Sequence, residues 1–151
     1  MLPSLNTSNL LLAIAVLAGI VAMLPLVRFS QRLPISARRR FWALSLFVAA
    51  LIYVVVALIV ERSMVASQLV GLVIYSAIAL LGVWRWPRLL AVGWALHMVW
   101  DFLGHPITLD PLAPNPSFMP WWYPPACLGA DLFVAGILWY GLAGDEQGGA
   151  D

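Results

Sequence analysis

The residues of this sequence best suited to chemistry lie in one short segment, residues 96–106. It contains His97, Asp101 and His105 among leucine, valine and tryptophan. The spacing of four residues places all three side chains along one narrow stripe of an α-helix. Imidazole and carboxylate groups in such a stripe can bind a metal ion or exchange protons. We therefore expect a functional site here.

A second pair, Cys127 and Asp131, has the same spacing in a later apolar run. A charged carboxylate facing lipid costs ~2.5–3.5 kcal/mol on insertion scales. Asp101 and Asp131 are therefore expected to face the interior of a helix bundle, where each can form hydrogen bonds with the polar neighbours of the other.

One interpretation is a metal site. His97, Asp101 and Asp131, together with His105 or Cys127, would bind a divalent metal such as zinc or iron, with Asp101 and Asp131 as catalytic groups. A metal-bound water would then act as a nucleophile at neutral pH. His97 and His105 are ~12 Å apart on a regular helix, so His105 can join only if the helix ends near Gly104.

Two other interpretations fit the same residues. Histidine and carboxylate can form an acid/base pair or proton relay without a metal. Asp101 and Asp131 can also be structural, locking two helices through hydrogen bonds to His97. Taken alone, His105 is typical of an exposed rim residue, and Cys127 of a small apolar filler.

The composition indicates a membrane protein. The chain has 151 residues, of which 63% are hydrophobic and 10% charged, and its mean hydropathy is +0.93. Each of five apolar runs is roughly long enough to cross ~30 Å of hydrocarbon. We expect an all-α, five-helix transmembrane domain over residues 1–144 and a disordered acidic tail at 145–151. The expected spans are 10–27, 41–60, 64–83, 89–103 and 126–143.

The arginines predict the orientation. All eight basic residues are arginine, and only Arg62 lies outside the two loops that would share one side. The positive-inside rule then places the N-terminus outside and the C-terminus in the cytoplasm. We expect a multi-pass protein of the bacterial inner membrane. Anionic lipid accounts for the arginines, so no nucleic-acid partner is expected.

Several residues are expected to pack the helices together. Small residues at Ala15 and Gly19 allow close approach of a neighbouring backbone. The polar residues of the third run, among them Gln68 and Tyr75, are expected to bridge helices. The second run is almost purely aliphatic around Tyr53 and looks like a lipid-facing wall.

The predicted topology brings the polar groups of the fourth and fifth runs together. His97 lies ~10 Å below the outer end of its helix, and Asp131 ~9 Å below the start of the next. Residues 104–125 hold seven of the eleven prolines and are expected to lie along the outer membrane surface. We expect an outward-opening pocket between these two helices, roofed by that segment.

The motifs resemble those of a group of small polytopic bacterial membrane proteins without an assigned function. The pattern is His97-x3-Asp101-x3-His105-Pro106, followed by Trp122-Tyr123-Pro124-Pro125 and Cys127-x3-Asp131. It covers about a quarter of the chain. A second histidine often stands in that group where this sequence has Gly104. The resemblance implies a shared site without naming its reaction.

The function expected from these observations is metal-dependent chemistry, hydrolysis or oxidation, on a lipid or other hydrophobic substrate from the outer leaflet. The alternative is a non-enzymatic accessory subunit of a membrane complex, binding a pigment or haem through His97 or docking through its small-residue faces. A homo-oligomer also fits. Ion or proton movement is a third reading, although one acidic cluster gives no continuous path. The sequence has no nucleotide-binding loop, Cys-x-x-Cys pair or Gly-x-Ser-x-Gly motif.

Overall fold

The computed structural model describes residues 7–103 and 119–147, and these residues confirm an all-α fold. No strand occurs among them. The helices are α1 (Thr7–Gln31), α2 (Ile35–Val60), the 3₁₀ turn η1 (Arg62–Met64), α3 (Val65–Trp84), α4 (Arg88–Leu103) and α5 (Tyr123–Gln147).

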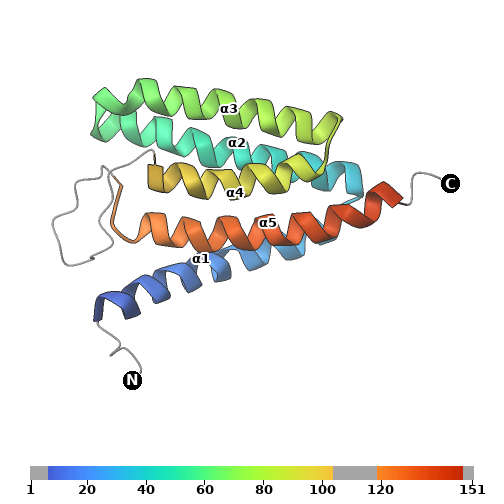
Figure 1. The fold of residues 1–151 in the computed structure, drawn as a ribbon, viewed down its shortest axis with the longest axis horizontal. Helices are drawn as coiled ribbons and strands as arrows, with labels where there is room; N and C mark the ends of the chain where they lie inside the picture. Colours follow the sequence, from blue (N-terminus) through green and yellow to red (C-terminus); the bar gives the residue numbers. More distant parts are fainter. Residues whose placement is uncertain (1–6, 104–118, 148–151) are drawn as a thin grey trace.

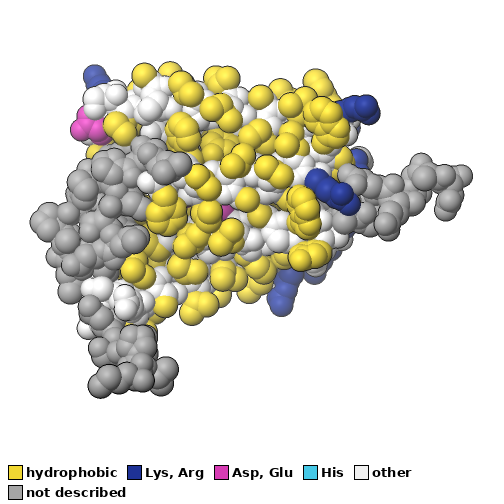
Figure 2. All heavy atoms as spheres, viewed as in Figure 1, with side chains coloured by type: hydrophobic (Ala, Val, Ile, Leu, Met, Phe, Trp, Pro, Cys, Tyr) yellow, Lys and Arg dark blue, Asp and Glu magenta, His cyan; other side chains and the backbone are white. Residues whose placement is uncertain are grey.

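Three helical segments are long and apolar enough to cross a membrane. They are Thr7–Gln31, Ile35–Val60 and the continuous segment Arg62–Trp84, with mean hydropathies of 2.9, 3.0 and 2.1. Much of their surface consists of large exposed hydrophobic side chains, such as Ile59 and Val73. Figure 2 shows this apolar surface extending between arginines at the two ends of the molecule. These are the properties of a membrane protein.

Three helices, α1, α2 and α5, extend beyond the runs expected from the sequence. α2 begins at Ile35 rather than 41, so Arg38, Arg39 and Arg40 lie in its first turns and not in a loop. α5 begins at Tyr123 and continues to Gln147, so the first three residues of the expected disordered tail are helical. Proline in the first turn of a helix, as at Pro124, loses no intrahelical hydrogen bond. The rest of that tail, residues 148–151, lies outside the described residues.

The helices pack around α4. α4 contacts α2, α3 and α5, while α1 lies along the far side of α5 and meets α2 mainly near their connecting turn (Figure 1). At that turn Phe29 and Phe41 stack with ring centroids 5.6 Å apart, and the Arg38 guanidinium donates to the Ser30 carbonyl. α1 is therefore attached to the bundle chiefly through α5.

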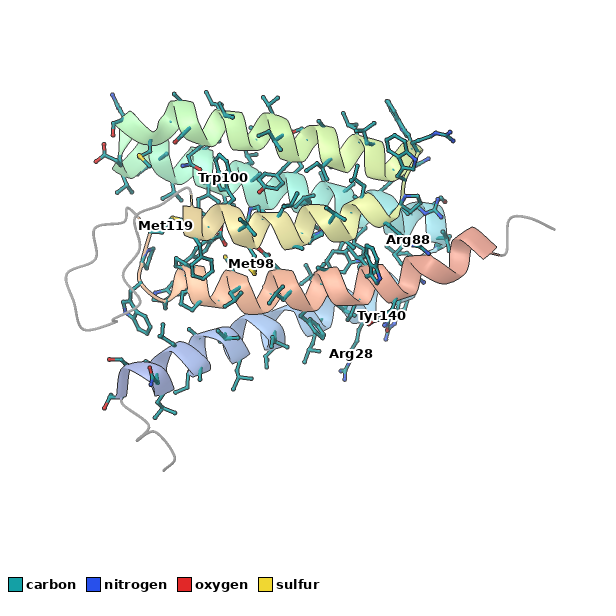
Figure 3. The ribbon with its side chains drawn as sticks, viewed as in Figure 1. Arg28, Arg88, Met98, Trp100, Met119 and Tyr140 are labelled. Carbon is teal, nitrogen blue, oxygen red and sulfur yellow. The ribbon has the colours of Figure 1, made fainter. Side chains whose placement is uncertain are left out.

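The apolar core occupies the half of the bundle nearer the arginine-rich end, where Arg28 and Arg88 lie (Figure 3). Its fully buried centre includes Leu46 and Leu90. The Trp42 and Trp94 rings meet edge to face in this core with centroids 5.9 Å apart. This packing fixes α4 against α2 and so sets the position of the polar residues one to two turns further along α4.

Small residues let α1 approach α5 closely. A side-chain carbon built at Gly19 would overlap the Ala126 carbonyl, and one at Gly129 would overlap the Val16 carbonyl. Backbones this close leave no room for a methyl group. The contact at Gly19 confirms the small-residue packing predicted for the first helix.

We predict that Gly19→Ala lowers the thermal unfolding midpoint in detergent, because the added methyl separates α1 from α5. Overpacking of this kind costs ~1–3 kcal/mol. Gly136→Ala is the matched control, since a side-chain carbon there meets nothing within 4 Å. Equal midpoints for the two variants would show that the contact between α1 and α5 tolerates the methyl group.

Candidate metal centre between α4 and α5

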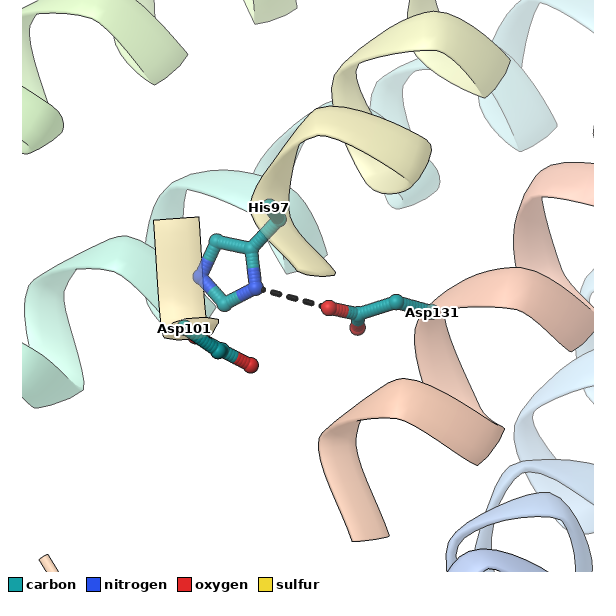
Figure 4. A group of neighbouring side chains, drawn as sticks. All are labelled: His97, Asp101 and Asp131. Atoms are coloured by element: carbon teal, nitrogen blue, oxygen red, sulfur yellow. Dashed lines mark hydrogen bonds and ion pairs between the residues drawn. The ribbon is translucent and has the colours of Figure 1, made fainter. Parts of the chain in front are cut away.

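A histidine and a carboxylate join α4 to α5 in the interior of the bundle. His97 Nδ1 lies 2.9 Å from Asp131 Oδ2 (Figure 4). His97 is 2% exposed and Asp131 is 3% exposed. The prediction that these two residues lie at the same level of adjacent helices is confirmed.

Asp101 lies one turn beyond His97 on the same face of α4 and is fully buried. The Tyr53 hydroxyl, from α2, donates to Asp101 Oδ1 at 2.6 Å. The expectation that α2 is a lipid-facing wall is therefore wrong at Tyr53, which is 1% exposed. The sequence feature that indicates this burial is a lone polar residue in an aliphatic helix, because its hydroxyl needs a hydrogen-bond partner inside the bundle.

The three residues have a geometry that could hold one metal ion. His97, Asp101 and Asp131 each offer a ligand atom, and these atoms all lie within 4.8 Å of one another. Zinc bonds to nitrogen and carboxylate oxygen measure ~2.0–2.2 Å. Small side-chain movements would therefore bring the three atoms into one coordination shell.

Two buried ligand atoms in this group have no hydrogen-bond partner, His97 Nε2 and Asp101 Oδ2. Leaving a buried polar atom unsatisfied costs ~1–3 kcal/mol. If Nδ1 carries the proton and donates it to Asp131, the lone pair of Nε2 is available to a cation. Carboxylates often orient metal-binding histidines in this way. Asp131 thus suits either a direct ligand or a group that positions His97.

Aromatic rings surround the imidazole. The ring centroids of Tyr53, Tyr75 and Trp94 lie 5.7, 5.2 and 6.4 Å from that of His97. These rings exclude bulk water, and electrostatic interactions are stronger in a medium of low dielectric constant. The arrangement therefore strengthens the His97–Asp131 pair and would strengthen the binding of a cation at the same place.

Polar residues of α3 hold α4 in place, as predicted. The Tyr75 hydroxyl donates to the Leu96 carbonyl at 2.9 Å, and Trp100 Nε1 donates to Gln68 Oε1 at 3.3 Å. Gly71 lies directly beneath the Trp100 ring. These contacts fix α4 on both sides of His97.

Two of the predicted ligands lie outside the three-residue group. Cys127 is partly buried on α5 and interacts with Asp101 and with the hydroxyls of Tyr53 and Tyr123. It does not belong to the group whose ligand atoms share one 4.8 Å neighbourhood among the described residues. His105 and residues 104–118 of the expected roof lie outside the described residues.

An apolar groove of about 400 Å³ reaches His97 and Asp131 from the side of the bundle. Its walls come from α1, α2 and the start of α5. The sequence predicts a pocket between the fourth and fifth helices. Within the described ranges, however, the cavity that reaches His97 and Asp131 opens where α1 and α2 stand apart.

The chain belongs to a family of unknown function, DUF6010, whose model matches residues 12–144. No curated protein and no solved structure matches it. The match confirms the expectation of an uncharacterised family. The specific motif pattern and a bacterial source stay predictions.

We predict that Tyr53→Phe lowers the free energy of unfolding by ~1–3 kcal/mol, because it removes the donor to a buried carboxylate. The ring packing against His97 is retained in this variant. Tyr140→Phe serves as the control, since Tyr140 is 82% exposed. Chemical denaturation in mixed micelles measures both changes, and a Tyr53→Phe value equal to that of the control would contradict the role of this bond.

Proposed function

We propose that this member of the DUF6010 family is a membrane enzyme with a divalent metal ion, zinc or iron, at His97, Asp101 and Asp131. Its substrate is a lipid or another hydrophobic molecule. The observation that carries the proposal is the convergence of three buried ligand residues within 4.8 Å in an otherwise apolar bundle.

The charge of the group supports a cation. Two carboxylates face one imidazole, so with both aspartates ionised the group is negative even when His97 is protonated. Uncompensated buried charge is strongly unfavourable. A divalent ion would neutralise the two carboxylates and would give the unpaired Nε2 and Oδ2 atoms a partner.

The number of ligands supports catalysis rather than a purely structural site. Catalytic zinc sites use three protein ligands and leave a fourth position for water or substrate. Bound there, the metal would supply an activated water for hydrolysis, or a redox centre if it is iron. Asp131 would either bind the metal or hold the imidazole in position through Nδ1, and the Tyr53 hydroxyl would orient the Asp101 carboxylate.

The proposal includes five membrane crossings, with the arginine-rich end in the cytoplasm and the N-terminus outside. The basic residues at that end are Arg28, Arg32, Arg38, Arg39, Arg40, Arg85 and Arg88, whereas Arg62 lies opposite. α4 has 16 residues and so spans only ~24 Å. Its position among α2, α3 and α5 supports a short span sheltered from lipid. A bacterial inner membrane, and a homo-oligomer or membrane complex, complete the proposal.

A metal-free acid/base pair is the second candidate. The His97–Asp131 hydrogen bond favours it, because a carboxylate at Nδ1 raises the basicity of Nε2, as in catalytic dyads. A non-enzymatic subunit that binds haem through His97 would differ from both in its visible absorption spectrum.

We expect protein purified in detergent without chelator to contain about one equivalent of zinc or iron. Asp101→Asn and Asp131→Asn should each lose most of it, because each removes a negative ligand. Elemental analysis by mass spectrometry provides the measurement. Glu61→Gln is the control, since Glu61 is exposed at the end of α2.

The metal proposal fails if the parent protein contains no metal and takes none up when zinc or iron is added back. Metal retained in full by both asparagine variants would also refute the assigned ligands. A Soret absorption band lost on substitution of His97 would support the haem-binding subunit instead.

A further inference from the structure

We propose that the groove between α1, α2 and α5 receives one hydrocarbon chain of an anionic lipid, from the leaflet at the arginine-rich end. The far part of that chain would then lie beside His97 and Asp131. The lipid would be the substrate of the proposed enzyme. Binding of its chain does not depend on that function, whereas any reaction of the chain does.

The lining of the groove suits hydrocarbon along most of its length. Met23 and Leu26 form one wall and Phe41, Leu44 and Val48 the other, while His97 and Asp131 lie further in, followed by Cys127 and Tyr123 towards the start of α5. Apart from Ser45, whose hydroxyl donates to the Phe41 carbonyl of its own helix, the polar groups gather beside and beyond His97. A bare hydrocarbon chain satisfies this lining, whereas a polar headgroup inside the groove would lose its hydration without gaining partners.

The length of the groove matches a single leaflet. On α2 it runs from Phe41 to Ile52, which is ~16 Å along a helix. Half of a ~30 Å hydrocarbon layer is ~15 Å. One acyl chain that extends from the membrane surface to the midplane therefore fits the groove.

Basic residues at the arginine-rich end of the groove favour an anionic headgroup. Met23 and Leu26 lie just before Arg28 in the last turns of α1, and Arg32 follows in the connection to α2. Basic residues at a membrane surface attract anionic lipids by ~1 kcal/mol each. A headgroup held by these arginines places its chain along the groove.

This geometry places an inner part of the chain, rather than the headgroup, next to the polar group. His97 and Asp131 lie about one leaflet's depth from the arginines, so a carbon near the far end of the chain would lie beside them. Entry is lateral and from the arginine-rich side, in contrast to the outer-leaflet entry expected from the sequence.

Two other apolar hollows provide internal comparisons. One lies between α2 and α3 and has Arg40 in its lining, so it could also attract an anionic headgroup, and the other lies between α4 and α5. Their volumes are about 520 and 560 Å³. Neither is lined by His97, Asp101 or Asp131. Lipid that merely coats the protein would occupy all three, whereas a substrate chain would prefer the groove that reaches the polar group.

The test uses the full chain in vesicles of phosphatidylcholine with phosphatidylglycerol that carries a diazirine in the middle of one chain. After illumination, peptide mass spectrometry locates the adducts. We expect adducts to concentrate on the groove-lining parts of α1, α2 and α5. The same diazirine chain on phosphatidylcholine should give several-fold less labelling there.

Val48→Trp should fill the groove and remove most of these adducts. The matched control is Val73→Trp, because Val73 is 69% exposed on α3 and lines none of the three hollows. Even labelling of all three hollows, equal labelling by the two headgroups, or unchanged labelling of Val48→Trp would each overturn the inference.

Metal content measured on the same preparations separates this inference from the proposed function. Concentrated labelling in protein that binds no metal would refute the metal enzyme and leave the chain-binding groove standing. Bound metal without concentrated labelling would refute the groove alone.

Discussion

The structure depends on keeping two carboxylates inside an apolar helix bundle. Each must find partners, and each partner comes from a different helix: His97 of α4 for Asp131, and Tyr53 of α2 for Asp101. Three helices are thereby tied together within two successive turns of α4. Around these turns the packing is aromatic, so the polar group is confined and water is excluded. The cost of burying charge in lipid thus explains the convergence of the helices, and it is the physical basis of the proposed cation binding.

The sequence was sufficient to predict the all-α fold and the meeting of His97 with Asp131. Hydropathy gave the helix runs, and the four-residue spacing gave the stripe on α4. The role of Tyr53 was missed, because its partner is 48 residues away and aliphatic neighbours on its own helix suggested a lipid contact. The groove was also missed, since periodicity within one helix does not reveal how far two helices stand apart.

The bounds of the helices differ from the apolar runs for a related reason. Hydropathy marks the part of a helix that suits hydrocarbon, whereas backbone hydrogen bonds continue into the interface. α2 therefore includes Arg38, Arg39 and Arg40, and α5 extends over polar residues to Gln147. The arginines are consequently carried on helical turns, where their spacing along the membrane surface is fixed.

The attachment of α1 gives the close contact at Gly19 a second meaning. α1 forms one wall of the groove, yet it is joined to the bundle by α5 and by the turn before α2. The closeness of α1 to Ala126 of α5 therefore sets the distance between α1 and α2, as well as the stability of the contact between α1 and α5. Glycine and alanine at the contact between α1 and α5 thus determine the width of the groove, so under the proposed lipid binding the size of residues far from His97 would select which chains enter.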